Sequence, residues 1–438
     1  MAPEIWRLRS RPWRSPPMLV CSIGIATAIL VVALPVGATS AAPTQWADTS
    51  TPSASSGAGL SGVSCVTSAD CIAVGGTSGD SPAAGPTLVQ TWNGSTWSVI
   101  PSPSPGTSSN VLDSISCARA SFCVAVGDYQ NNGGGISPLI ETWNGVNWSV
   151  DTPASPLRAD DMLGVSCVRP TDCVAVGYEG AFGSFQTLIE TWDGSAWSLS
   201  PSPNPGPNDE LSNVSCVSAT DCVAVGSVGT LTLIERWDGT TWSVDPSPDP
   251  SNTSDHLSGI SCVNVRDCVA VGQYANGQIE QTLVETWDGT TWSVVDTPNP
   301  GTSFNQLTSV SCVKSTDCVA VGNDRGSDSS STLTLMESWD GTRWSTDPSS
   351  SPDTENQLDA VSCVSSHSCV TVGDHANGSV NDNIPGGGIK TLAEIGSECQ
   401  LPPIAPEAPV TLALPVSALV VIGGFVAIRH RRLRSSKG

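Results

Sequence analysis

Residues 211–250 read LSNVSCVSATDCVAVGSVGTLTLIERWDGTTWSVDPSPDP, and a closely similar stretch begins at residue 257. Short apolar runs in it are separated by polar turns, and no window has convincing helical periodicity. We divide the unit into four expected β-strands, here called a to d: VSCV, CVAVG, TLIERW and WSV. The Asp-Gly between strands c and d is a strong hairpin signal, because glycine accepts the positive φ that the turn needs. The unit therefore predicts a four-stranded antiparallel sheet.

This unit recurs seven times along the chain, beginning near residues 60, 112, 162, 211, 257, 307 and 358. Successive first cysteines are 46 to 52 residues apart. A period near fifty fits one blade of a β-propeller better than it fits any helical solenoid. We expect an all-β, seven-bladed propeller over residues 43–400.

The seventh unit is incomplete, and a lone tryptophan near the N-terminus can complete it. Gly396 stands where the first tryptophan of this unit is expected, and no strand d follows. TQWADTSTPS, residues 44–53, matches TTWSVDTPNP in the fifth unit. We therefore predict that Trp46 lies in strand d of the last blade, so that the N-terminus closes the ring and removes an exposed sheet edge.

Six c–d hairpins carry paired tryptophans, from Trp92 and Trp97 to Trp339 and Trp344. Large aromatic residues at fixed blade positions fill the space between neighbouring blades, each burying on the order of 200 Å². A carbohydrate platform is the alternative, and it would need exposed rings. We favour packing, since the pairs recur identically.

Fourteen of the sixteen cysteines form seven pairs with five residues between partners. At this spacing the partners face each other across the a–b hairpin, and an oxidising exterior favours one disulfide per blade. A zinc site is the alternative, but the region has few histidines that could serve as further ligands. The expected disulfides are Cys65–Cys71, Cys117–Cys123, Cys167–Cys173, Cys216–Cys222, Cys262–Cys268, Cys312–Cys318 and Cys363–Cys369.

The order CVAVG, variable loop, TLIERWDGTTW resembles the kelch repeat. SWDGTRW at residues 338–344 is similar to the Asp-box hairpin of sialidase-like propellers, although it is one residue shorter. The whole pattern also resembles uncharacterised secreted repeat proteins of actinobacteria. These resemblances imply a propeller and supply no activity.

Both ends of the chain indicate export. Residues 1–42 have an arginine-rich start, an apolar run and small residues, as in a signal peptide, with an uncleaved signal anchor as the alternative. Residues 401–409 form an expected linker, and residues 410–428 an apolar segment long enough to be a transmembrane helix. The basic tail, residues 429–438, favours the cytoplasmic side. We expect a single-pass cell-membrane protein with its N-terminal domain outside.

The exterior region is strongly acidic. Residues 43–408 hold 9 lysines and arginines against 40 aspartates and glutamates, a net charge of −31. Such a field disfavours nucleic acid and anionic lipid as partners. An acidic surface of this kind is typical of proteins that are soluble outside the cell. The more specific alternative is that it binds cations or a basic partner.

The b–c loops differ in length and content between units, and variable loops on a rigid scaffold are where binding usually occurs. The residues directly after the strand-b glycine are expected to ring the mouth of the central channel, where they are either merely solvated or a binding site. These candidates are Asp128, Tyr129, Tyr178, Glu179, Gln273, Tyr274, Asn323, Asp324, Asp374 and His375.

We expect a monomeric, non-catalytic module that binds a surface protein or polysaccharide through this face. No catalytic residue, metal or cofactor is predicted. The alternative is a surface carbohydrate-active enzyme, a hydrolase or an oxidase, with its site at the channel mouth.

Overall fold

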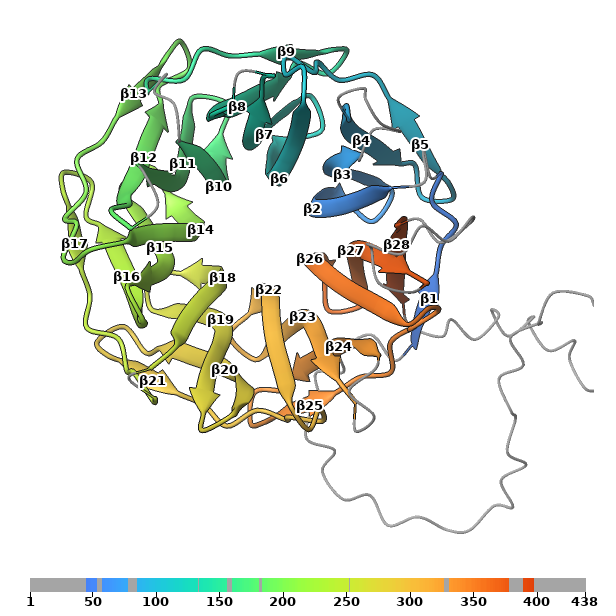
Figure 1. Ribbon diagram of the computed structural model, residues 1–438, viewed down its shortest axis with the longest axis vertical. Coiled ribbons are helices and arrows are strands. Elements are labelled where there is room, and N and C mark those ends of the chain that lie inside the picture. The colour runs from blue at the N-terminus through green and yellow to red at the C-terminus, as the bar shows by residue number, and fades with distance from the viewer. Residues whose placement is uncertain are drawn as a thin grey trace, which may run out of the picture. The chain divides into compact units, whose positions relative to one another are not determined.

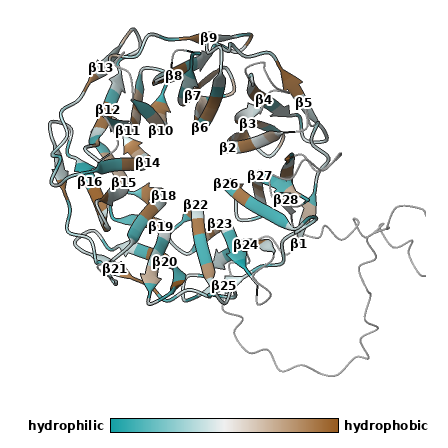
Figure 2. Ribbon diagram, viewed as in Figure 1, coloured by the Kyte–Doolittle hydropathy of each residue, from teal (hydrophilic) through white to brown (hydrophobic). Residues whose placement is uncertain are grey.

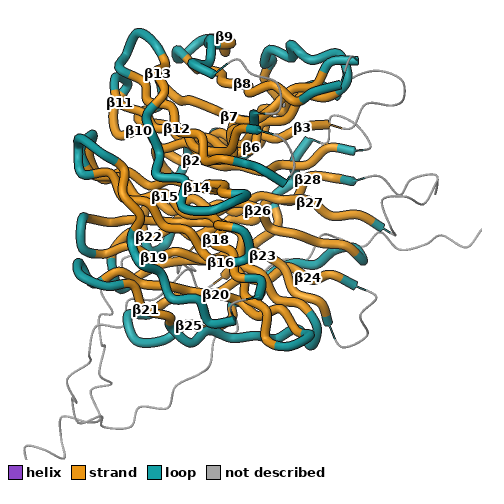
Figure 3. The backbone as a smooth tube through the Cα atoms, turned by 60° about the vertical axis from the view of Figure 1, so that its left-hand side comes forward, coloured by secondary structure: helices purple, strands orange, loops and turns teal. Residues whose placement is uncertain are grey.

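The computed structural model describes residues 45–52, 57–77, 85–132, 134–155, 160–180, 183–251, 253–326, 331–377 and 389–397. These residues form seven four-stranded antiparallel sheets around a central axis (Figure 1). Between them run only turns and loops, with no helix in the described part (Figure 3). The described residues therefore form an all-β, seven-bladed propeller.

In blades one to six, strands a to d follow one another along the chain, with strand a innermost. Blades one to three comprise β2 Ala58–Thr67, β3 Asp70–Thr77, β4 Thr87–Trp92 and β5 Trp97–Ile100; β6 Ser109–Arg119, β7 Phe122–Gln130, β8 Ile136–Trp143 and β9 Trp148–Val150; β10 Asp161–Arg169, β11 Asp172–Glu179, β12 Gln186–Trp192 and β13 Trp197–Leu199. Blades four to six comprise β14 Asp209–Ser218, β15 Asp221–Val228, β16 Leu231–Trp237 and β17 Trp242–Val244; β18 Asp255–Asn264, β19 Asp267–Asn276, β20 Ile279–Trp287 and β21 Trp292–Val294; β22 Phe304–Lys314, β23 Asp317–Arg325, β24 Thr332–Trp339 and β25 Trp344–Thr346. Blade seven comprises β26 Glu355–Ser365, β27 Ser368–Ala376, β28 Lys390–Ser397 and β1 Gln45–Asp48.

The N-terminal strand closes the ring. Strand β1 pairs antiparallel with β28, and Trp46 lies opposite Gly396. Thr49 extends the pairing, because its backbone N–H donates to the Ala393 carbonyl at 2.8 Å. The lone tryptophan therefore belongs to the last blade, as its sequence context predicts.

The motif serine of strand a joins each blade to the next. In blade four the Ser215 hydroxyl accepts from the Cys262 backbone N–H of blade five at 3.0 Å. The same bond recurs across all seven interfaces, including the closing one from Ser362 of blade seven to the Cys65 N–H of blade one at 3.0 Å. The serine in VSCV is thus explained by a repeated contact between blades.

Strand b is apolar on both faces because a neighbouring blade covers each face. Val223, Ala224 and Val225 are each at most 1 % exposed. The core is divided into clusters that combine side chains of two successive blades, such as Val176 and Ile189 of blade three with Leu211 of blade four. The hydropathy colouring shows brown segments in these strands, whereas β26 is largely teal (Figure 2).

The strand-b glycine allows a close approach between strands. A Cβ atom on Gly272 would lie 1.9 Å from the His256 carbonyl oxygen of strand a. At the c–d turn, Gly289 has a φ of +91°, as the Asp-Gly hairpin requires.

All seven predicted disulfides are present, each joining partners with Cα atoms 4.0 to 4.1 Å apart.

The tryptophan pairs serve packing. The second member of each pair is 5–7 % exposed, and the first donates its indole N–H to a carbonyl of its own a–b turn, as Trp237 does to Ala219 at 3.3 Å. Paired rings lie 5.5 to 5.7 Å apart.

Among the described residues there is no helix long and apolar enough to cross a membrane. The expected signal segment (1–42), linker (401–409), span (410–428) and basic tail (429–438) lie outside those residues.

Candidate functional site

Strand a is longer than its VSCV core suggests, and its N-terminal half lines the central channel. In every blade, strand a has a register shift opposite the strand-b glycine and the residue before it. In blade two the shift lies between Leu112, which pairs with Gly127, and Ser114, which pairs with Val126. Such a β-bulge re-aims a side chain out of the regular ladder. The bulged residues are Ser61, Asp113, Leu163, Ser212, Ser258, Thr308 and Asp359.

These seven residues and their neighbours on strand a enclose a cavity of about 240 Å³ on the propeller axis. Every blade contributes to its wall. A cavity of this size admits one or a few side chains of a ligand, and its lining is mainly polar.

Three carboxylates meet at this channel. Asp113 lies at the bulge of β6, Asp128 follows the glycine of β7, and Asp161 begins β10 in the next blade. One oxygen from each lies within 4.8 Å of the others. Desolvation, followed by repulsion from Asp128, raises the pKa of Asp161 to about 6. Burial, with repulsion from Asp161, Asp128 and Asp359, raises the pKa of Asp113 well above its usual range.

A second acidic pair adjoins the same channel from blade seven. Burial, followed by the charge of Asp374, raises the pKa of Asp359 to about 7. The Gln357 side-chain amide donates a hydrogen bond to Asp359 and partly offsets this rise. Asp374 reaches blade one, where its Oδ2 lies 3.0 Å from the place a Cβ on Gly59 would occupy. We call Asp113, Asp128, Asp161, Asp359 and Asp374 the channel cluster.

The channel cluster lacks lysine and arginine partners among the described residues. None of the ion pairs found in this part of the chain joins a lysine or arginine to any of its five carboxylates. His375 adjoins Asp374, and its charge opposes the rise that burial causes in the pKa of that carboxyl. A second imidazole, His256, has its Nδ1 3.7 Å from Glu210 Oε1 in the adjacent blade. Burial lowers the pKa of His256, and Glu210 opposes that change. Desolvated carboxylates without a lysine or arginine partner favour a positively charged ligand.

The ten residues predicted from sequence fall into two groups, because successive side chains of a strand point to opposite faces. The first residue after the glycine meets the start of strand a at the channel. Tyr178 donates its hydroxyl to Asp161 at 3.3 Å, and Asp128 and Asp374 belong to the channel cluster. Gln273 and Asn323 occupy the same position, opposite His256 and Gln306 in register.

The second residue of each pair contacts the blade core or a connecting segment instead. Tyr129 packs on the apolar cluster shared by blades one and two. Tyr274 donates to Gln281 Oε1 at 2.6 Å. His375 Nδ1 lies 2.6 Å from Asp353 Oδ2, in the connection before β26. Asp324 is 6 % exposed, and burial, then Asp160, raises the pKa of Glu179.

The three tyrosines therefore do not gather into one aromatic surface. The carboxylates Asp113, Asp161 and Asp359 were not among the sequence candidates, although the Asp in LDSIS and LDAVS stands at the same place in two units.

If the channel holds a metal, Asp113, Asp128 and Asp161 would supply three carboxylate oxygens, which are ligands that Ca²⁺ prefers.

No protein-family model matches this chain, and no curated protein matches it. Its fold is similar to that of solved structures. YCF48 bound to D1 peptide is 13% identical, with a TM-score of 0.52 over 82% of this chain and 100% of that one. U3-55K is also 13% identical, with a TM-score of 0.50 over 77% of this chain and 95% of that one. At this identity the likeness shows the fold alone, a β-propeller.

Proposed function

We propose that this chain is a non-catalytic binding module whose ligand is a protein partner, and that a positively charged segment of the partner enters the channel mouth. The observation that carries the proposal is a group of five desolvated carboxylates at the channel. Asp113 and Asp359 line the axial cavity, Asp128 and Asp161 lie beside Asp113, and Asp374 lies beside Asp359. None of the five is paired with a lysine or arginine among the described residues. Cationic side chains would relieve their mutual repulsion and supply the missing hydrogen-bond donors.

The site is built for recognition, because its groups lie on strands and not on the loops alone. Seven blades joined by the serine bonds hold the channel cluster in a rigid frame, so little order must be gained on binding. The neighbouring fold of YCF48 was solved with a D1 peptide, and this supports a peptide segment as the ligand here.

We further propose that the module works outside the cell, tethered by residues 410–428. The apolar segments at both ends of the sequence and the seven disulfides support this placement. Two measurements test this placement. A fluorescent protein fused to the C-terminus reports whether that end lies in the cytoplasm, and protease added to intact cells reports whether the propeller is accessible from outside.

The partner proposal is tested with the full-length chain and a panel of basic, neutral and acidic dodecapeptides. The mouth variant is D113N/D161N/D359N, which removes three charges from the channel. The matched control is D193N/D238N/D340N, which removes three charges from the c–d turns on the opposite face. Asn93 and Asn144 already occupy this turn position in blades one and two and accept the same backbone bonds, so the control preserves the fold.

Basic peptides should bind the wild-type chain and the control alike, and the mouth variant at least about tenfold more weakly, an electrostatic loss of ~1.4 kcal/mol or more. Equal binding by all three proteins, or a preference for acidic peptides, would contradict the proposal.

A further inference from the structure

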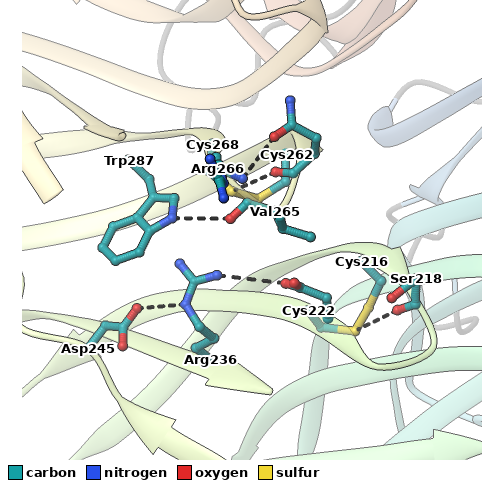
Figure 4. Close-up of polar contacts among 12 residues, drawn as sticks. Cys216, Ser218, Cys222, Arg236, Asp245, Cys262, Val265, Arg266, Cys268 and Trp287 are labelled. Atoms are coloured by element: carbon teal, nitrogen blue, oxygen red, sulfur yellow. Dashed lines mark hydrogen bonds and ion pairs between the residues drawn. A yellow bond between two sulfur atoms is a disulfide. The ribbon is translucent and has the colours of Figure 1, made fainter. Parts of the chain in front are cut away.

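Arg236 fills the space between blades four and five (Figure 4). It lies on β16, and its guanidinium carbon is 4.4 Å from the ring centroid of Trp287 in the next blade. Its Nε is 2.9 Å from Asp245 Oδ2, and its Nη1 is 3.7 Å from Asp221 Oδ1. One aromatic face and two carboxylates thus hold a guanidinium at this interface.

The equivalent position in blades three and five carries a much smaller side chain. Arg236 lies opposite Val223 in register, and in the same way Thr191 lies opposite Val174 and Thr286 opposite Val269. A threonine cannot span the interface as an arginine does. The space that Arg236 fills in blade four is therefore left open beside both threonines.

A cavity is present at each of these two interfaces. The one between blades three and four has a volume of about 170 Å³, with Thr191, Trp192, Trp237 and Asp172 in its wall. The other, between blades five and six, has a volume of about 210 Å³. Its wall includes Thr286, Trp287, Trp339 and Asp267.

The cavity walls repeat two of the three groups that hold Arg236, the tryptophan and the strand-b aspartate, whereas Ser200 and Val295 stand at the position of Asp245. Trp237 and Trp339 take the place of Trp287 in the following blade, and Asp172 and Asp267 take the place of Asp221 at the start of strand b. Asp172 is held by Arg169 at 3.0 Å and Asp267 by Asn264 at 2.6 Å, in both cases through Oδ2. Hydrogen bonds of this kind orient each carboxylate at the cavity.

Two other interfaces, between blades two and three and between blades seven and one, are occupied by apolar side chains of the chain itself. Phe122 stands at the Asp221 position in blade two and packs in the cluster that contains Trp192. Ile395 stands at the Arg236 position in blade seven and packs in the cluster that contains Trp92. Beside Thr191 and Thr286 neither an apolar residue nor an arginine reaches in, and the aromatic and acidic walls remain open.

We propose that these two inter-blade cavities bind arginine side chains of a protein partner. The chain supplies its own example of the bound group in Arg236, and the net charge of −31 over residues 43–408 favours a basic partner. Both cavities open near the a–b and c–d turns, the face opposite the b–c loops. This surface is therefore separate from the channel mouth, and either site can fail without the other.

The probe is N-acetyl-arginine-N-methylamide, and its neutral isostere N-acetyl-citrulline-N-methylamide is the control ligand. Full-length chain with ¹⁵N-labelled tryptophan is titrated, and the indole resonances of Trp237, Trp287 and Trp339 are followed by NMR. A single arginine in such a cavity should bind with a Kd on the order of 1–10 mM. The citrulline ligand should bind at least about fivefold more weakly, because it lacks the charge.

Two variants close the cavities and one opens a new cavity. T191R and T286R introduce the side chain that blade four already has, so T191R should remove the saturable shift at Trp237 and T286R the shift at Trp339. Because Trp287 also lines the second cavity, R236T is made in the T286R background, where it should create a saturable shift at Trp287 that T286R alone lacks. D172N keeps the shape of the first cavity and should weaken the binding of the arginine ligand but not that of the citrulline ligand. This variant tests the first cavity even if T191R does not fold.

Equal affinity for the arginine and citrulline ligands would overturn the proposal. So would shifts at Trp237 and Trp339 that persist in T191R and T286R, or the absence of a new site in R236T/T286R. The D113N/D161N/D359N variant alters the channel mouth and should leave the arginine-induced shifts of Trp237 and Trp339 unchanged. A failure of the channel-mouth proposal is thereby distinguished from a failure of the inter-blade cavities.

Discussion

The Ser247 hydroxyl, in the connection after blade four, lies 2.9 Å from the carboxylate of Glu285, which is fully buried in blade five. The same hydroxyl lies 2.7 Å from Thr232 of its own blade. Equivalent glutamates in blades two to seven are all at most 1 % exposed and accept from the preceding connection: Glu141, Glu190, Glu235, Glu285, Glu337 and Glu394. Blade one has Gln90 instead, whose amide donates to the Pro52 carbonyl at 3.3 Å. These residues join each blade to the one before it.

The buried glutamates predict a stability that falls as pH rises. Burial raises the pKa of Glu285 and of Glu337 to about 8. The folded protein therefore keeps protons that the unfolded chain, with ordinary glutamates, releases above pH ~4.5. The free energy of unfolding should be greatest near pH 5 and should decrease up to about pH 8–9, by on the order of 1–3 kcal/mol for each strongly shifted site. Guanidinium denaturation across this range measures it.

Replacement of two glutamates by glutamine should flatten this pH dependence. Gln90 shows that an amide is accepted at the position, so E285Q/E337Q should fold and be at least as stable as wild type at pH 8. Glu280→Gln, elsewhere on β20, is the control and should leave the slope unchanged. A wild-type slope in the double variant would show that the buried glutamates are not responsible.

Each disulfide should stabilise the domain separately. Closing a loop as short as that between Cys312 and Cys318 contributes about 2–3 kcal/mol in the chain-entropy model. The C312A/C318A variant should lose that amount in equilibrium unfolding and retain the other six bridges, as non-reducing peptide mass mapping would show. Free thiols at these pairs in the wild-type protein would contradict the structure.

Removal of the closing strand should destabilise the whole ring. Deletion of residues 43–50 leaves β28 as an unpaired edge and removes Trp46, so the loss should be about 3–5 kcal/mol in a single cooperative transition. Ala47→Ser, at an exposed position of the same strand, should change the stability by less than ~0.5 kcal/mol. An unchanged melting temperature after the deletion would mean that β1 is dispensable.

Relief of repulsion in the channel should stabilise the protein. Asp359 has a pKa of about 7 because of burial and the nearby Asp374, so at pH 8 it is ionised at a cost. D359N should raise the free energy of unfolding at pH 8 by on the order of 1 kcal/mol, and by less at pH 5, where Asp359 already holds a proton. Thermal denaturation at the two pH values measures the difference, with D193N as the control. A loss of stability at pH 8 would show that the carboxylate makes a favourable contact.

The blade count, the seven disulfides and the closing strand could be predicted because each leaves a periodic or complementary mark in the sequence. The Cys pairs recur at a fixed spacing, and Trp46 replaces the tryptophan missing opposite Gly396. The division of the site residues could not be predicted from VSCV alone. The bulge before it, which turns Asp113 and Asp359 into the channel, does not follow from alternation.

Contacts between blades depend on the curvature of the ring, which the sequence does not state. Tyr129 and Asp128 are adjacent in the chain, yet one packs on blade one and the other meets Asp161 of blade three. The arginine at position 236 is conspicuous as the one departure from Thr, Ser or Ile at this place in the repeat. Only the structure relates it to Trp287 and to the open cavities at Thr191 and Thr286.

Site-specific photo-crosslinking tests the central claim, a protein partner at the channel mouth, most directly. A benzophenone amino acid is placed at Tyr178, beside Asp161, and separately at Val146, which is 73% exposed in a c–d turn of the opposite face. The full-length chain is irradiated in its own cells, and the crosslinked peptides are sequenced. The account predicts a protein crosslink at 178 that maps to a lysine- or arginine-rich segment and is lost in the D113N/D161N/D359N background. Crosslinks that form at 146 alone, or that persist at 178 without the three aspartates, would contradict it.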